Sequence, residues 1–217
     1  MKKTDKPRKI DRFLHALFAA PARFLLRVRV KGRENIPQIG GYVMVCNHMS
    51  FLDPIVLSAA FPRKRMPKYL AKAELFRIPV LRGIIRMFGA IPVERGRGDV
   101  GAIRRSVDVA KSGEILAVFP QGTRQKGKNP ADTPTKSGGA MIAFRAGVPI
   151  LPVCICVKKQ RYAFLRRVTV VVGEPISLES LGLMTEEPNF REATAAAFGV
   201  ACALGGYRPS ALPETTV

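Results

Sequence analysis

Short, strongly apolar runs separated by amphipathic stretches are the feature that most constrains the fold of this chain. Residues 42–46 and 115–119 are runs of this kind, and each ends at turn residues, which is typical of a buried strand. Between them, residues 54–61 and 99–111 carry apolar side chains at helical spacing. Strands and helices that alternate at these lengths predict an α/β fold, with a central mixed, largely parallel sheet flanked by helices.

The remaining elements follow from the same criteria. We expect one domain over residues 28–217, because hydrophobic residues make up 47% of the chain and no repeat or linker divides it. The prolines at 149 and 152 are expected to break the strand that contains them. Further strands are predicted at 27–31, 68–71, 89–95, 148–157 and 167–173, and further helices at 74–88, 136–146 and 189–204.

The first 27 residues have a different character. Residues 1–10 form a basic arm, and residues 11–26 form an apolar helical stretch that is interrupted by Pro21 and flanked by arginines. This pattern predicts an N-terminal amphipathic segment that associates with a membrane, although packing against the core fits it equally well. The basic face of the helix at 74–88 leaves the same choice between solvent and anionic lipid. No apolar run approaches the length of a spanning helix, so we expect peripheral or monotopic contact.

The net charge of +20 predicts an anionic partner without choosing among nucleic acid, an anionic membrane surface and a small phosphorylated substrate. We expect no nucleic acid, because the basic residues are scattered, no recognition motif is present, and the chain has no Trp. The four cysteines lack metal-ligand spacing. We therefore expect no metal site and reduced core thiols in a cytosolic compartment.

One segment brings a histidine and a carboxylate close together in the sequence. His48 follows the buried run 42–46, and Asp53 stands where a helix is predicted to begin. On a continuous helix, residues five apart point about 140° away from each other, but across a strand-to-helix turn they can meet. A carboxylate bonded to Nδ1–H leaves Nε2 free to take a proton from a hydroxyl. Alternatively, Asp53 is an ordinary N-cap, and Asn47, His48 and Ser50 are ordinary turn residues.

A second turn follows the buried run 115–119. Gly122 and Thr123 supply backbone N–H groups and a hydroxyl, and Arg124 supplies a fork of donors that matches a phosphate. Arg95, at the end of another predicted strand, offers a second fork. Because ligands of open α/β sheets bind at the carboxyl ends of strands, we expect the two turns to share one phosphate-binding site.

Four blocks of this chain resemble the 1-acylglycerol-3-phosphate acyltransferase family. The first, residues 47–53, is an Asn-His pair with Ser two residues and Asp five residues after the His. The second, residues 89–95, is similar to the family's Gly-x-Ile-Pro-Val-x-Arg, and residues 148–153 are similar to its Val-Pro-Ile-x-Pro-Val. Residues 119–124 resemble Phe-Pro-Glu-Gly-Thr-Arg with one departure, Gln121 in place of Glu. The resemblance spans about residues 28–176 and implies a glycerolipid acyltransferase-like fold.

The resemblance implies transfer of a fatty acyl group from a thioester, either acyl-CoA or acyl carrier protein, to the free hydroxyl of 1-acylglycerol-3-phosphate. The product would be phosphatidic acid for phospholipid synthesis. The implied partners are the membrane lipid acceptor, the thioester donor and an anionic membrane surface, at the cytoplasmic side of the membrane. No cofactor is implied beyond the donor substrate, and no acyl-enzyme is needed.

The resemblance also implies roles for individual residues. His48 would be the general base and Asp53 its orienting partner, and backbone N–H groups are expected to stabilise the oxyanion. Replacing Glu by Gln121 would either weaken the hold on Arg124 or let an amide donate to the phosphate, which leaves acceptor choice open. Another lysophospholipid, an amino-lipid acceptor or an inactive membrane-binding relative are the other outcomes. The implied phosphate ligands are Arg95, Gly122, Thr123 and Arg124, and the implied supporting residues are Asn47, Ser50 and Gln121.

Overall fold

The computed structural model describes residues 21, 23–94, 99–163 and 165–210. The predictions for the basic arm, and for all but a few residues of the apolar segment 11–26, fall outside these residues. Within them, a short helical turn around residues 23–25 leads into the first strand of the sheet.

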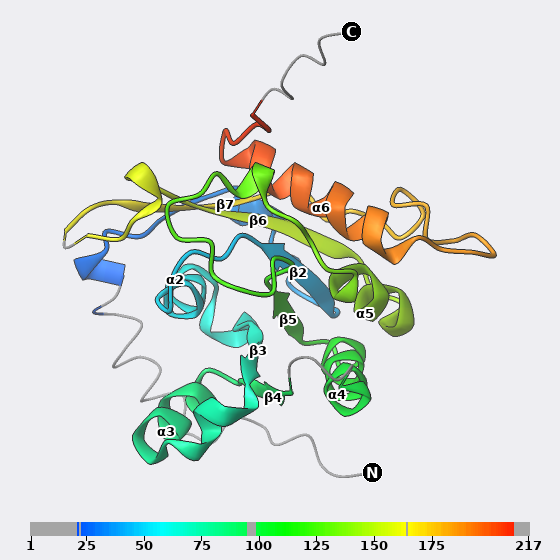
Figure 1. The fold of residues 1–217 in the computed structure, drawn as a ribbon, viewed down its shortest axis with the longest axis horizontal. Coiled ribbons are helices and arrows are strands. Elements are labelled where there is room, and N and C mark those ends of the chain that lie inside the picture. Colours follow the sequence, from blue (N-terminus) through cyan, green and yellow to red (C-terminus); the bar gives the residue numbers. More distant parts are fainter. Residues whose placement is uncertain (1–20, 22, 95–98, 164, 211–217) are drawn as a thin grey trace, which may run out of the picture.

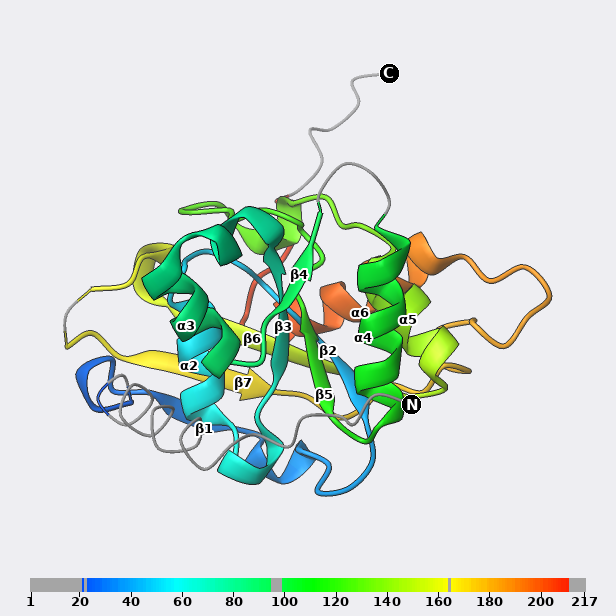
Figure 2. The same cartoon turned by 90° about the horizontal axis from the view of Figure 1, so that it is seen from below.

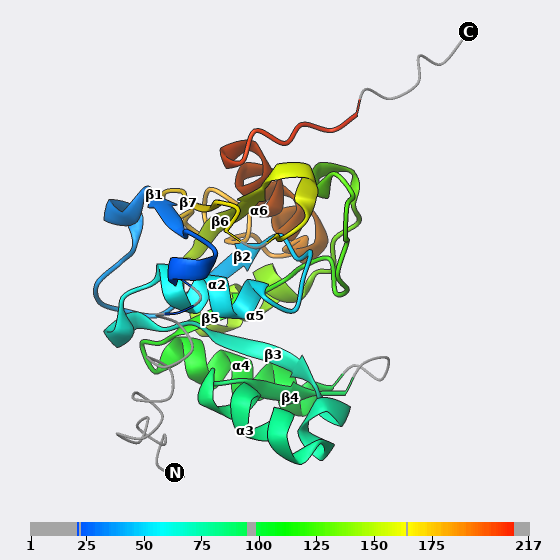
Figure 3. The ribbon, with the colours of Figure 1, turned by 90° about the vertical axis from the view of Figure 1, so that its left-hand side faces the viewer.

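A single twisted sheet organises the described residues, with the strand order β1-β7-β6-β2-β5-β3-β4. Neighbouring strands are parallel everywhere except between β6 and β7, which confirms the predicted mixed, largely parallel sheet. Strands β1 and β7 lie at one end of the sheet, and β3 and β4 lie at the other (Figure 3). The strands are β1 (Arg29–Lys31), β2 (Tyr42–Cys46), β3 (Lys68–Lys72), β4 (Ile91–Val93), β5 (Ile115–Val118), β6 (Ile150–Val157) and β7 (Val168–Val172).

Helices cover both faces of this sheet. Helices α2 and α3 lie on one side, and α4 and α5 lie on the other, while α6 runs along β6 (Figure 1). Seen from below, β3 and β4 pass between α3 and α4 (Figure 2). The helices are α2 (Asp53–Ala60), α3 (Pro79–Met87), α4 (Val100–Lys111), α5 (Gly138–Ala146) and α6 (Phe190–Leu204).

Strand β2 lies at the centre of the core, and all of its side chains are fully buried. Tyr42, Met44 and Cys46 pack into one apolar cluster with α2, and Val43 and Val45 pack into the other with α4, α5 and α6. A strand that is buried on both faces has no polar positions, which is why it is a continuous apolar run in the sequence.

Two boundaries differ from those expected from the sequence. The helix predicted at 74–88 is split into a 3₁₀ helix (Ala73–Arg77) and α3, because Ile78 is extended and Pro79 disfavours a helical residue before it. Strand β6, in contrast, continues through Pro152. The Pro152 carbonyl accepts from the N–H of Gly173, one residue past the last β6–β7 pair, so the bond that the missing N–H of Pro152 would make falls at the end of that ladder and not within it.

Candidate active site

His48 and Asp53 meet at the carboxyl edge of the sheet, as the strand-to-helix turn predicts. His48 lies two residues after the end of β2, and Asp53 is the first residue of α2. The Nδ1 atom of His48 lies 2.7 Å from Oδ2 of Asp53. The Asp53 side chain is completely buried, whereas that of His48 keeps 15% of its surface exposed. The histidine can therefore reach a ligand that its carboxylate partner cannot touch.

The Asp53 carboxylate is held by more than the histidine. Its Oδ2 also accepts from the backbone N–H groups of Met49 and Ser50, at 2.7 and 2.8 Å. Its Oδ1 accepts from the hydroxyl of Tyr162 at 2.7 Å. These bonds fix the carboxylate and the intervening turn together. Asp53 thus closes the turn and orients the histidine, but it is not the helix N-cap of the alternative interpretation, because the N-cap of α2 is Leu52 and no side chain caps the helix there.

Tyr162 was not singled out from the sequence. It follows β6, 109 positions after Asp53, and the only available signal was an aromatic residue just beyond a buried strand. Burial, and secondarily the charge of Asp53, raise the pKa of the Tyr162 hydroxyl far above its ordinary value. The hydroxyl therefore remains protonated at neutral pH and donates to the carboxylate.

The His48 ring is fixed by an aromatic contact as well. It stacks on Phe119, which follows β5, with ring centroids 4.1 Å apart and planes 18° apart. Since Asp53 occupies Nδ1, the stacked ring directs Nε2 away from the carboxylate. No group in the described part of the chain hydrogen-bonds to Nε2. The geometry suits an imidazole that accepts a proton at Nε2.

Gln121 lies beside the histidine and not beside Arg124. Its Oε1 accepts from the backbone N–H of His48 at 2.7 Å, and its Nε2 donates to Oγ1 of Thr133 at 2.7 Å. Among the described residues, Gln121 makes no hydrogen bond to Arg124, and an amide that donates to the phosphate stays a prediction. The amide group connects the His48 turn to the loop before α5.

Asn47 and Ser50 hold the same turn. The side-chain amide of Asn47 bonds both backbone groups of Ile155, accepting at 2.8 Å and donating at 3.0 Å. The Oγ of Ser50 accepts from the backbone N–H of Leu52 at 3.2 Å. Their contacts among the described residues hold the backbone of the turn, and the supporting role in the reaction that the resemblance implies for them stays a prediction.

The second turn lies next to the first, because β2 and β5 are parallel neighbours. Gly122 has a φ of 71°, which only glycine adopts without strain, and a Cβ there would lie 2.8 Å from Cε of Lys136. The guanidinium of Arg124 lies 3.5 Å from the centre of the exposed Phe51 ring. Thr123 is exposed beside them. The turn thus gathers two cationic side chains, and sequence reasoning had missed Lys136.

Arg95 lies outside the described residues, so its place in the site stays a prediction. No group of three or more His, Cys, Asp or Glu side chains within the described ranges is arranged to hold a metal ion. The cysteines are free thiols, and three of the four are buried.

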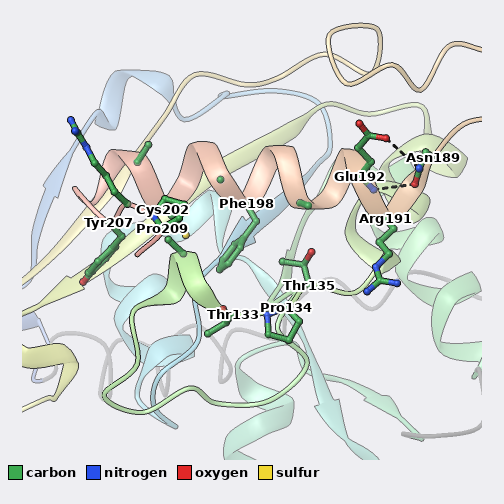
Figure 4. Close-up of a pocket in the computed structure, with 15 residues that line it drawn as sticks. Thr133, Pro134, Thr135, Asn189, Arg191, Glu192, Phe198, Cys202, Tyr207 and Pro209 are labelled. Carbon is green, nitrogen blue, oxygen red and sulfur yellow. Dashed lines mark hydrogen bonds between the residues drawn. The ribbon is translucent and has the colours of Figure 1, made fainter. Parts of the chain in front are cut away.

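A cavity of about 580 Å³ lies between α6 and the loop 131–135 (Figure 4). Phe198 points from α6 toward Pro134 across this cavity (Figure 4). Thr133, which also bonds Gln121, is part of its wall. The cavity is therefore separated from the His48 turn by Thr133 and Gln121, and neither His48 nor Asp53 lines it.

The fold and the site together define an α/β protein in which a partly exposed histidine pairs with a buried carboxylate at the carboxyl edge of the sheet. A family model described as Acyltransferase matches residues 27–156, which is more than half of the chain. The chain belongs to the Acyltransferase family.

Individual relatives agree with this assignment. A 1-acyl-sn-glycerol-3-phosphate acyltransferase of Bacillus subtilis (strain 168) is 29% identical, over 76% of this chain and 85% of that protein. The chloroplastic BAT2 enzyme of the same name from Brassica napus is 32% identical over 68% of this chain, which spans 43% of that relative. The crystal structure of PlsC from Thermotoga maritima, a 1-acyl-sn-glycerophosphate (LPA) acyltransferase, is similar with a TM-score of 0.68 and 27% identity, over 97% of this chain and 85% of that one.

Proposed function

We propose that this protein transfers a fatty acyl group from a thioester, acyl-CoA or acyl carrier protein, to the free hydroxyl of 1-acylglycerol-3-phosphate. The observation that carries the proposal is the 2.7 Å contact between Nδ1 of His48 and the fully buried Asp53 carboxylate. The names of the curated relatives support the choice of acceptor.

The reaction needs one base and no covalent enzyme intermediate. Nε2 of His48 takes the proton from the acceptor hydroxyl, whose oxygen attacks the thioester carbonyl. The imidazolium that forms is stabilised by the Asp53 carboxylate. The tetrahedral intermediate then expels the thiolate, which receives the proton from His48. The protein returns to its starting state with an ester and a free thiol as products.

The phosphate of the acceptor would bind at the second turn. Arg124 and Lys136 supply positive charge, and Gly122 and Thr123 supply backbone N–H groups and a hydroxyl. Arg95 completes the proposed set. Oxyanion donors are proposed to be backbone N–H groups near His48.

The surface of the protein supports action on lipid. Phe24, Phe51, Ile78 and Val80 are exposed apolar side chains, with exposed fractions of 52% to 78%. Exposed arginines accompany them in α3 and near the N-terminal end of the described chain. Within the described residues, no helix is both long and apolar enough to cross a bilayer. We propose contact with an anionic membrane surface, at its cytoplasmic side, by means of such side chains.

The test is thiol release by purified protein in mixed micelles that contain anionic lipid. The donors are a long-chain acyl-CoA and an acyl carrier protein thioester. The acceptors are lysophosphatidic acid, other lysophospholipids, an amino-lipid and glycerol-3-phosphate. Release that depends on lysophosphatidic acid is expected, and another preferred acceptor would revise the substrate but keep the chemistry. No release with any pair would refute the proposal.

The His48→Ala variant tests the base in the same assay. We expect a loss of about 10²- to 10⁴-fold in kcat with an unchanged fold. A variant that keeps most of its rate would contradict the assignment of His48. Lys128→Ala, a change of an exposed side chain, is the control for effects of substitution alone.

A further inference from the structure

The hydroxyl of Tyr162 contacts the carboxylate oxygen that His48 does not use. It donates to Oδ1 of Asp53 at 2.7 Å, while Oδ2 faces Nδ1 of His48. Among the described residues, Tyr162 is the only hydrogen-bond donor to Oδ1. Its ring packs against the apolar cluster that contains β2 and α2. The tyrosine therefore approaches the carboxylate from the segment that follows β6, the strand next to β2.

The backbone around Tyr162 is in an unusual conformation. Lys159, Gln160 and Leu165 have φ values of 56°, 49° and 55°, in the left-handed region that residues other than glycine rarely adopt. Such conformations persist where the surrounding structure holds them in place, and they cluster at functional sites. The partly buried Tyr162 ring and its bond to Asp53 anchor this segment between β6 and β7.

We propose that Tyr162 is a positioning residue for the His48–Asp53 pair: its hydroxyl binds Oδ1 so that Oδ2 stays directed at Nδ1 of His48. The inference rests on the proposed function for its catalytic consequence, but the contact itself does not. Tyr162 touches neither donor nor acceptor in this role.

The bond also withdraws charge from the carboxylate. A hydroxyl that donates to Oδ1 shares the negative charge that would otherwise concentrate on Oδ2 beside the imidazole. Among the described residues, the other titratable groups that face Asp53 are Cys46 from β2 and Tyr69 from β3. Burial raises the pKa of both, so they stay neutral across the range in which histidines titrate.

The test is Tyr162→Phe, which removes the hydroxyl and keeps the ring. We expect kcat to fall by roughly tenfold, well short of the loss from removing the base, with an unchanged KM for the acceptor. We also expect the acid limb of the kcat/KM profile to move to higher pH. Tyr42→Phe is the matched control, because Tyr42 is equally aromatic, fully buried and at the opposite end of β2 from His48.

A second measurement does not depend on activity. The chain has two histidines, so a His15→Gln background leaves His48 as the one imidazole in a ¹⁵N NMR titration. Tyr162→Phe should move the midpoint of that titration upward. Site-specific 3-fluorotyrosine at position 162, a stronger donor of nearly the same shape, should move it downward, and it serves if the Phe variant does not fold.

The outcomes separate the two proposals. A shifted His48 titration in a protein that releases no thiol would support the positioning role and refute the proposed function. An unchanged midpoint in both the Phe and fluorotyrosine proteins would overturn the positioning role. A loss of rate that is equal at every pH, with no shift in the kcat/KM profile or in the NMR titration, would also overturn it, because a residue with a purely structural role would give that result.

Discussion

The backbone N–H of His48 donates to Oε1 of Gln121 across 2.7 Å, so the histidine is held at its main chain as well as at its ring. The amide of Gln121 has a second partner, Oγ1 of Thr133, which itself donates to the carbonyl of Pro130 at 2.6 Å. Since the Thr133 proton is already directed to that carbonyl, Oγ1 must accept from Gln121, and only an amide nitrogen can donate there.

Gln121→Glu should therefore destabilise the protein, although it restores the residue of the family pattern. A carboxylate can accept from His48 but cannot donate to Thr133, and we expect a loss of about 1 to 2 kcal/mol in the free energy of unfolding. Denaturant unfolding at pH 7 measures it. The double variant Gln121→Glu with Thr133→Val should recover part of the loss. Equal stability of wild type and single variant would show that the Thr133 hydroxyl reorients freely.

Asp53→Asn should impair catalysis more than folding. An amide can accept from Nδ1–H and from one backbone N–H, but it carries no charge to stabilise the imidazolium. We expect kcat to fall by about 10²- to 10⁴-fold and the free energy of unfolding to fall by about 1 to 3 kcal/mol. Thiol release and thermal unfolding measure the two effects. Asp108→Asn, on the exposed face of α4, is the control, and a rate within a few-fold of wild type for Asp53→Asn would contradict the pairing.

Lys136→Ala should weaken use of phosphorylated acceptors. The Lys136 side chain lies over Gly122, and removing its charge should raise the acceptor KM by roughly fivefold, which corresponds to about 1 kcal/mol. The comparison is Lys128→Ala, an exposed lysine of the same loop, which should leave KM unchanged. An acceptor without a phosphate should not distinguish Lys136→Ala from wild type, and if it does, the lysine acts in some other way.

Arg65→Ala should destabilise the amino-terminal edge of the sheet. The guanidinium of Arg65 donates to the carbonyls of Pro37, Gly40 and Gly113, which belong to the segments that precede β2 and β5. Losing these bonds should lower the free energy of unfolding by about 2 kcal/mol, measured by urea denaturation. Arg63→Ala, an exposed arginine of the same 3₁₀ turn, should change it by less than about 0.5 kcal/mol. Similar losses in both variants would point to a general effect of charge.

The sheet and the His48–Asp53 contact were predictable because the information for them is local. Strands β2 and β5 are buried on both faces and are therefore continuous apolar runs. The contact spans only five residues, and the turn that joins them is marked by Pro54 at the start of α2. The break before Pro79 was also marked locally, by the proline itself. One continuous helix over residues 74–88 was nevertheless predicted, because the apolar residues on both sides of the proline keep helical spacing.

Tyr162 and Lys136 could not be placed from the sequence because their neighbours are set by strand order. Tyr162 reaches Asp53 because β6 lies beside β2, and the two strands are far apart along the chain. The contacts of Gln121 are hidden for another reason. Gln and Glu differ most obviously in charge, so the sequence suggested an electrostatic effect. In the structure, the amide of Gln121 instead accepts one hydrogen bond and donates another.

The Asn47 side chain has a further consequence. By bonding both backbone groups of Ile155, its amide takes the place of a peptide unit, so β2 remains paired with β6 for one step after its main chain turns toward α2. His48, the residue that follows Asn47, is consequently attached to the last point at which β2 is hydrogen-bonded to β6. Adjustment to substrates of different size should then take place in the segment between residues 122 and 136, while His48 keeps its position.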